Sequence, residues 1–210
     1  MLPPTIPLFP LPNTVLFPNV FLPLHIFEPR YRSMVVDALE GDRLIGLVLL
    51  KPGYEMEYEG RPAVYDIGCA GVITHTERLE DGCFNIVLRG LEKFKVTEED
   101  EGKPYRIGRV QHLAESLDDV VRDELRRQRL RLEAVLAAAL ERAGGEPRFP
   151  PAIPDDDLVN GLSQYMQLAP IERQALLERE GVLERCRSLI DLIQMNGMAT
   201  GAGWTGRSTH

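Results

Sequence analysis

IPLFPLPNTVLFPNVFLPLHIFEPRYR, residues 6–32, is the stretch that decides the fold of this chain of 210 residues. Six prolines punctuate it, at positions 7, 10, 12, 18, 23 and 29. Each proline fixes its own φ angle and pushes the residue before it toward extended geometry. The apolar residues between the prolines therefore cannot form a helix, and we expect short strands and stiff turns that lie across a core.

A helix is expected where this stretch ends. Glu28 and Pro29 fit a helix start, because proline is tolerated at the first helical position and an acidic side chain favours the positive end of the helix dipole. Gly41 fits the residue just after the helix. Apolar residues recur between these positions with the helical period and define one buried face: Tyr31, Met34, Val35, Ala38 and Leu39.

The segment that follows has the pattern of strands. One continuous apolar run, RLIGLVLL, indicates a strand that is buried on both faces. An Asp81-Gly82 pair between two runs of β-forming residues predicts a hairpin. The sequence therefore predicts a buried strand at 43–50, hairpin strands at 64–79 and 83–96, an acidic turn at 97–104 and a last strand at 105–113.

The pattern becomes helical from Glu115 onward. The apolar stripes of four expected helices are Leu117, Val121, Leu125, Leu132, Leu136 and Ala139, then Leu158, Leu162, Tyr165 and Met166 after Asp155–Asp157, then Ile171, Ala175 and Leu176 after Pro170, then Leu183, Cys186, Leu189, Ile190 and Ile193. We therefore expect an α+β protein with a β-rich subdomain at 1–113, a helical subdomain at 114–197 and a disordered tail at 198–210.

Charge and cysteine content limit the classes of partner and compartment. The net charge of −8 opposes general binding to nucleic acid, which needs a basic face. The one basic cluster, 126–131, is interpreted as a solvated helix face, with an RNA contact as the alternative. Three cysteines without CxxC spacing indicate a reducing cytoplasm. The sequence shows no secretory signal and no membrane-spanning run, so we expect a cytoplasmic protein without membrane contact.

Motifs for cofactor or nucleophilic chemistry are incomplete. The candidate phosphate-binding loop at 102–103 lacks its other residues, and the GxGxxG match at 201–206 has no strand before it and no helix after it. Ser163 lacks the final glycine of a GxSxG elbow and is interpreted as a solvated helix residue. Cys69 and His75 would lie about 20 Å apart along one strand, too far for one metal ion. We expect no catalytic residue, no cofactor and no metal.

The order of motifs resembles the N-terminal substrate-binding domain of Lon proteases. Residues 6–26 match the opening pattern IPLxPLxxxVLFPxxxxPLxI of that family. Residues 66–73, DIGCAGVI, resemble the next family strand, xxVGTxAxI, with Cys69 and Gly71 as departures. Residues 90–96 resemble its GxxRFxI strand, and the helical half matches more loosely. HIFEPRYRSMV resembles in particular the short, stand-alone members.

The resemblance implies a PUA-like β pseudobarrel with one or two helices, followed by a helical bundle and without the ATPase and protease domains. It also implies a non-enzymatic module that binds protein or peptide clients, as an adaptor or regulator in proteolysis. The side chains predicted to bind them lie in the opening stretch: Phe17, Phe21, His25, Glu28, Arg30 and Tyr31. Taken alone, His25 fits a hydrogen-bonded structural histidine, and the two phenylalanines fit either a contact or the core.

Two other functions are kept as alternatives. An RNA-binding module is the first, because other PUA-like barrels bind RNA. An enzyme of unrecognised type is the second, with a site near His25, Glu28 and Arg30. A deep pocket on which these three side chains converge would favour the enzyme.

Overall fold

The computed structural model describes residues 2–57, 60–100, 102–142 and 153–196. The chain divides into two compact units: Met1–Ala114 with Asn160–Glu178, and Glu115–Val159 with Arg179–His210. The tail predicted to be disordered, 198–210, lies outside the described residues. Whether the predicted domains, 1–113 and 114–197, fold independently stays a prediction. No helix in the described ranges has the length and apolarity needed to cross a membrane.

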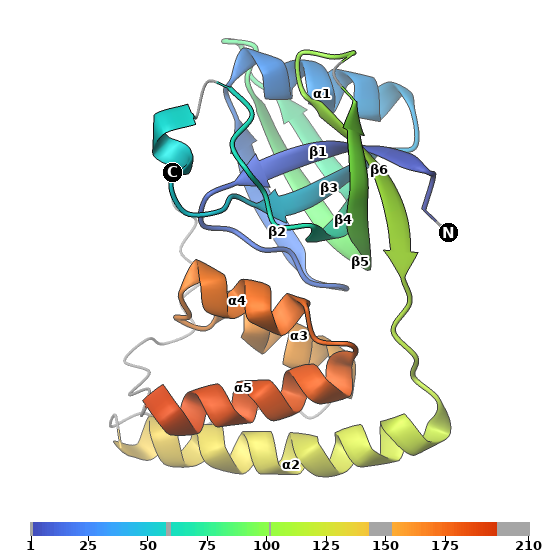
Figure 1. The fold of residues 1–210 in the computed structure, drawn as a ribbon. Helices are drawn as coiled ribbons and strands as arrows, with labels where there is room; N and C mark the ends of the chain where they lie inside the picture. The colour runs from blue at the N-terminus through green and yellow to red at the C-terminus, as the bar shows by residue number, and fades with distance from the viewer. Residues whose placement is uncertain (1, 58–59, 101, 143–152, 197–210) are drawn as a thin grey trace. The chain divides into compact units, whose positions relative to one another are not determined.

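A mixed sheet organises the first unit (Figure 1). Its strand order is β2-β5-β4-β3-β1-β6, and β5 also pairs with β6, so five strands close a ring and β2 lies outside it on β5. The β1–β3 pair is parallel and the other pairs are antiparallel. The α+β class is confirmed. The strands are β1 Thr5–Leu11, β2 Phe21–Ile26, β3 Leu44–Leu49, β4 Ile67–Arg78, β5 Phe84–Asp100 and β6 Arg106–Leu113.

The length of β5 explains how the ring closes. Residues 84–89 of β5 pair with β2, and residues 93–100 pair with β6. One edge of this strand therefore serves two partners in succession, while β4 occupies the other edge over residues 84–95. A bulge between Val96 and Glu98 accompanies the pairing with β6, and bulges add local twist and bend the strand.

Three of the six prolines of the opening stretch lie in β1 and β2, where the backbone is extended. Pro7 lies in the part of β1 that pairs with β6, and Pro10 lies in the part that pairs with β3. Pro23 lies in β2, whose one neighbour in the sheet is β5. Each proline thus has a neighbouring strand on one side, where a missing backbone N–H is tolerated. The prediction of extended segments is confirmed.

The predicted hairpin is confirmed, and its turn places Gly82 at a φ of 81°. The strand predicted at 43–50 is confirmed as β3, which is buried along almost its whole length. The prediction of a turn over 97–104 is wrong for its first half, because β5 continues to Asp100. The acidic composition of this segment is typical of a turn. Pairing with β6, which includes Asp100 with Ile107, nevertheless keeps it in a strand.

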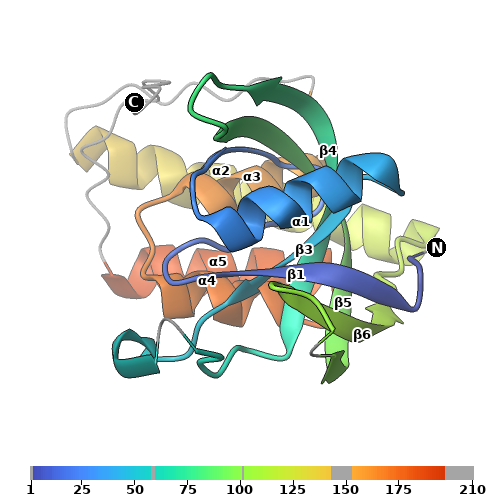
Figure 2. The ribbon, with the colours of Figure 1, turned by 90° about the horizontal axis from the view of Figure 1, so that it is seen from above.

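Helix α1, Pro29–Glu40, lies over the strands at one end of the ring (Figure 2). Pro29 is its first residue, as predicted, and its buried residues are Tyr31, Met34, Val35 and Ala38. Gly41 follows the helix, but its φ of −113° is not left-handed. Arg43 takes the positive φ instead, at 60°, and its N–H donates to the Ala38 carbonyl.

Two helices of the second unit pack together: α2, Asp119–Arg142, and α5, Val182–Asn196 (Figure 1). They run in the same direction, since Arg187 near the start of α5 pairs with Glu124 near the start of α2 at 3.3 Å. The buried residues confirm much of the predicted stripes: Leu125, Leu132, Leu136 and Ala139 on α2, and Leu183, Cys186, Leu189, Ile190 and Ile193 on α5.

Helices α3, Asp155–Tyr165, and α4, Pro170–Leu177, correct three predictions. On α3, Ser163 is fully buried and not solvated, and Tyr165 of the predicted apolar stripe is 54% exposed. Ile171 is half exposed and Ala175 is exposed, so the inner face of α4 is formed by Gln174, Leu176 and Leu177 instead. The start of α4 at Pro170 is confirmed. A short 3₁₀ helix, η1 Tyr54–Glu57, completes the described elements.

Candidate functional site

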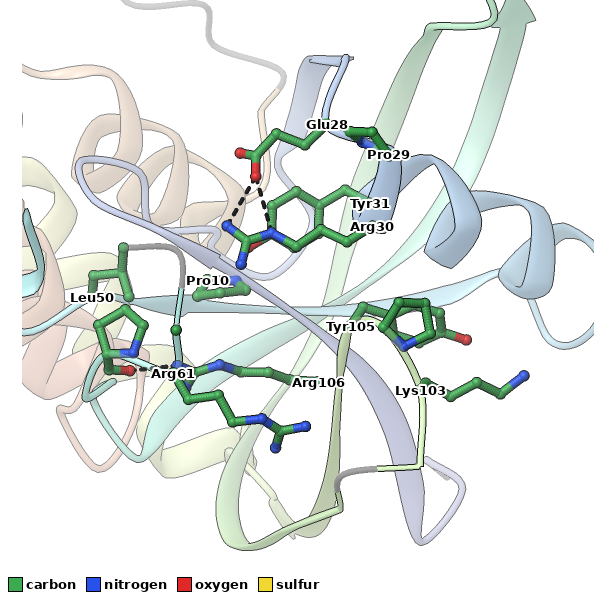
Figure 3. Close-up of a pocket in the computed structure, with 13 residues that line it drawn as sticks. Pro10, Glu28, Pro29, Arg30, Tyr31, Leu50, Arg61, Lys103, Tyr105 and Arg106 are labelled. Atoms are coloured by element: carbon green, nitrogen blue, oxygen red, sulfur yellow. Dashed lines mark hydrogen bonds and ion pairs between the residues drawn. The ribbon is translucent and has the colours of Figure 1, made fainter. Parts of the chain in front are cut away.

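A cavity of about 550 Å³ opens on the first unit, beside the start of α1 (Figure 3). Its walls come from segments that are far apart in the sequence: the end of β1, the first turn of α1, the end of β3, and the loops that precede β4 and β6. Its lining residues are Pro10, Glu28, Pro29, Arg30, Tyr31, Leu50, Gly60, Arg61, Pro62, Lys103, Pro104, Tyr105 and Arg106.

The first turn of α1 supplies an ion pair and an aromatic ring. Arg30 donates to the Glu28 carboxylate from Nε at 2.9 Å, and its second contact with the same oxygen is also 2.9 Å. The Arg30 guanidinium lies 4.7 Å from the centroid of the Tyr31 ring, and this ring in turn packs on Phe9. Because these contacts fix the guanidinium, Arg30 presents a positioned charge at one wall (Figure 3).

Two arginines form the opposite side of the cavity. Arg106 is 6% exposed and donates to the Pro62 carbonyl at 2.6 Å and to Glu99 at 3.3 Å. Arg61 donates to the Asp100 carbonyl and lies 3.9 Å from Glu99. Burial lowers the pKa of Arg106, although Glu99 opposes this effect. A guanidinium that burial has stripped of water gains more from a nearby anion than a solvated one does.

Lys103 and Tyr105 meet at one carboxylate, that of Asp37 in α1. The Tyr105 hydroxyl donates to Asp37 at 2.6 Å, and the Lys103 ammonium donates to the same oxygen at 2.9 Å. The hydrogen bond from Tyr105 is the main reason that the pKa of Asp37 falls below its ordinary value, and Lys103 adds to it. Burial and the Asp37 carboxylate together raise the pKa of Tyr105.

The structure brings together three of the residues predicted to bind, namely Glu28, Arg30 and Tyr31. His25 does not line this cavity; its Nδ1 lies 2.9 Å from the Asn85 side-chain oxygen, which fits a hydrogen-bonded histidine. Phe17 is fully buried, and its backbone N–H donates to Gln164. It therefore presents no surface to a partner.

Phe21 belongs to a second feature, an exposed aromatic stripe on β2. Residues 21, 23 and 25 are the exposed positions of this strand. Phe21 is 53% exposed and Phe27, just beyond the strand, is 62% exposed. The rings of His25 and Phe27 stack with centroids 6.2 Å apart. We call Phe21, His25 and Phe27 the aromatic stripe.

Sequence reasoning missed most of the cavity, since its residues come from loops without periodicity. Two short motifs in acidic segments mark the cavity. Arg61-Pro62 and Lys103-Pro104 both line it, and each pair follows a glycine in the sequence. A basic residue that precedes a proline within an acidic segment is the sequence pattern that could have indicated this cavity.

The basic cluster 126–131 behaves largely as predicted for a helix face. Arg127 pairs with Glu124, and Arg129 pairs with Glu133 and Asp155 at 2.9 and 2.7 Å. Arg129 is the exception to solvation, with an 11% exposed side chain. The three cysteines are free and buried, as predicted for Cys69 and Cys186. Within the described ranges no group of three His, Cys, Asp or Glu side chains gathers in a way that would hold a metal ion.

Comparison with known proteins gives consistent matches. Residues 5–195 match the family model of the ATP-dependent protease La (LON) substrate-binding domain. Lon protease of Flavobacterium johnsoniae is 28% identical over 192 residues, which cover 88% of this chain and 23% of that protein. Lon protease of Dictyoglomus thermophilum is 28% identical over 201 residues, covering 90% and 24%. The chain thus spans about a quarter of the length of these curated relatives.

Solved structures show the same fold. A Lon N-terminal domain protein from Xanthomonas campestris aligns with a TM-score of 0.63 at 24% identity, over 89% of this chain and 97% of that one. The N-terminal domain of Mycobacterium avium complex Lon protease aligns with a TM-score of 0.66 at 17% identity, over 90% and 98%. The motifs, the fold and the family model agree, and the chain belongs to the family of ATP-dependent protease La (LON) substrate-binding domains.

Proposed function

We propose that the chain is a non-enzymatic module that recognises protein or peptide clients in the cytoplasm, as an adaptor or regulator of proteolysis. The single observation that carries this proposal is the match of residues 5–195 to the Lon substrate-binding domain. The protein whose domain gives the family its name acts on polypeptides, and a substrate-binding domain recognises them. We further assign the ring of strands to the PUA-like pseudobarrel class and the helical half to a bundle.

Two features of the first unit support peptide recognition. The aromatic stripe exposes large apolar side chains, and such surface marks interaction sites in soluble proteins. Strand β2 stands at the end of the sheet order, so its outer edge has no neighbouring strand within the described sheet. An extended peptide can add to such an edge through main-chain hydrogen bonds, while its side chains contact exposed rings. The Tyr165 hydroxyl occupies one acceptor of this edge, the Phe21 carbonyl.

The test is binding to an array of overlapping peptides from one unfolded reference protein. The wild-type chain should bind a subset of them, and affinities for the best binders are then measured by fluorescence anisotropy. The double variant Phe21→Ser, Phe27→Ser should weaken binding by about tenfold, since one buried aromatic side chain contributes more than the ~1.4 kcal/mol of a factor of ten.

Val120→Ser provides the matched control, because Val120 is an apolar residue of α2 that is 78% exposed. It should leave the affinities unchanged. Failure of the wild type to bind any peptide on the array would contradict the proposed function. Equal weakening by Val120→Ser would show that the aromatic stripe is not the recognition surface.

A further inference from the structure

The described lining of the cavity is mainly cationic in a molecule that is acidic as a whole. The chain has a net charge of −8. Among the described residues that line the cavity, four are cationic and one is a carboxylate: Arg30, Arg61, Lys103 and Arg106, with Glu28. A local field of opposite sign inside a concave site attracts a ligand of negative charge.

The cations are held in place before any ligand arrives. Arg61 and Lys103 each precede a proline, and Arg30 follows one. Proline fixes its own φ and restricts the residue before it, so these backbone segments lose little freedom on binding. Arg106 is fixed by its buried bond to the Pro62 carbonyl.

Ion pairs position the four cations. In the described part of the chain, Arg30 pairs with Glu28, Arg61 and Arg106 pair with Glu99, and Lys103 pairs with Asp37. Pro10, Leu50 and the Tyr31 ring also line the cavity, so an apolar stem attached to the anion finds apolar contacts.

We propose that this cavity binds a carboxylate of the client polypeptide, from an acidic side chain or from its C-terminus. The proposal rests on the proposed function and adds the chemical class that the module prefers. Arginine forks donate two parallel hydrogen bonds to a carboxylate, and such charge-assisted bonds are stronger than neutral ones. The aromatic stripe supplies affinity for apolar peptide segments, and the cavity adds a preference for an anionic group.

The test uses one fluorescent peptide that the chain binds, prepared in three forms. The first keeps its acidic side chains and free C-terminus, the second replaces Asp and Glu by Asn and Gln, and the third carries a C-terminal amide. The form that lacks the recognised carboxylate should bind the wild type about tenfold more weakly in the anisotropy measurement. A factor of about ten corresponds to the loss of one hydrogen bond to a charged group. The form that loses affinity identifies the source.

Arg61→Gln should abolish this difference, so that all three forms bind alike, and Arg61→Lys should restore part of it. Arg126→Gln removes an exposed arginine from α2 and should keep the full difference. Lys103→Gln is the second variant, for use if Arg61→Gln does not fold, because the Lys103 side chain is 48% exposed. It should likewise reduce the difference in affinity between the three forms.

Three other results have defined meanings. Measurable but equal binding of all three forms by the wild type overturns the carboxylate proposal and leaves the proposed function standing. If no peptide of the array binds, the proposed function is contradicted, and the carboxylate proposal falls with it. Stronger competition by phosphate than by acetate at matched ionic strength also overturns the proposal, because the cavity would then prefer a doubly charged anion.

Discussion

At the scale of single residues, Gly90 is a position of β5 where the structure leaves no room for a side chain. A Cβ placed on Gly90 would lie 2.0 Å from the backbone oxygen of Phe17, which cannot move aside as a flexible side chain would. Gly90 also exchanges backbone hydrogen bonds with Val20 and Asn19 on the same segment. We expect Gly90→Ala to lower the free energy of unfolding by about 3 kcal/mol, the upper end for overpacking.

Urea denaturation measures this change, and Gly161→Ala is the control. A Cβ on Gly161 meets nothing within 4 Å, and alanine is the better helix former, so this variant should gain up to about 1 kcal/mol. A Gly90→Ala protein as stable as the wild type would show that the segment around Phe17 can yield.

Glu124 gives the second residue-scale prediction, which concerns pH. Hydrogen bonds from Gln128 and Arg127 lower the pKa of the Glu124 carboxyl to about 2. A carboxyl whose pKa is lower in the folded than in the unfolded protein stabilises the fold. This stabilisation is fully present above the pKa of the unfolded protein, near 4.5, and is lost as the pH falls toward about 2. Glu124→Gln should therefore reduce the slope of unfolding free energy against pH in this window, as measured by urea titrations at several pH values.

Asp123→Asn removes an exposed charge from the same helix and controls for the change in net charge. If the pH dependence of the unfolding free energy is the same in Glu124→Gln and in the wild type, the pKa of Glu124 is not lowered in the folded protein.

At the scale of elements, one buried ion pair connects α5 with the segment that leads into α2. Arg185 is fully buried, and its guanidinium pairs with the Glu115 carboxylate, with one contact at 3.3 Å. Removing one partner of a buried pair leaves a desolvated charge poorly compensated. We expect Glu115→Gln to lower the free energy of unfolding by about 3 kcal/mol.

The comparison variant is Glu184→Gln, which breaks a pair with Arg187 whose side chains are 44% and 47% exposed. Exposed pairs contribute about 1 kcal/mol at most, and salt weakens them further. Thermal or urea unfolding of both variants checks the contrast. Losses of equal size would contradict the view that burial makes the difference.

Elements defined by local pattern could be predicted, whereas those defined by a distant partner could not. The hairpin at Asp81-Gly82 and the helix that begins at Pro29 depend on residues that are adjacent in the sequence. The extension of β5 to Asp100 depends on the register with β6, which composition does not encode. The prediction that Ser163 is solvated was wrong for a similar reason, because its burial comes from tertiary packing.

The candidate site follows the same rule. Glu28, Arg30 and Tyr31 were predicted because they stand together at a junction between strand and helix. Arg61 and Arg106 were missed because they meet only after the ring has closed. Charge and motifs predicted a class of partner, whereas they did not predict most of the residues that line the cavity.

At the scale of the whole molecule, the ring of strands depends on residues that come late in the sequence. Gln164 accepts a hydrogen bond from the Phe17 N–H at 3.0 Å, and Gln174 donates to the Ile67 carbonyl at 2.9 Å. Both glutamines are buried and belong to the same compact unit as the strands. We expect a chain of residues 1–114 to lose cooperative unfolding, because buried backbone groups and apolar surface would be uncovered.

Calorimetry of the fragment against the full chain measures this effect. A matched fragment with residues 115–210 supplied as a separate chain should recover a cooperative transition if the contacts alone are needed. A fragment 1–114 that unfolds cooperatively at the temperature of the full chain would instead support the predicted domain 1–113.

The closed ring has a consequence for how the protein is made. Strand β1 leaves the ribosome before both of its partners, since it pairs with β3 in parallel and with β6 through contacts such as Thr5 with Arg109. Pairings this distant in sequence form slowly, and unpaired strands are prone to aggregate while they wait. The apolar opening stretch is therefore exposed throughout much of translation, and the prolines that stiffen β1 also make it a poor template for wrong pairing. Strand β1 is therefore fully paired only after the much later strand β6 has been synthesised.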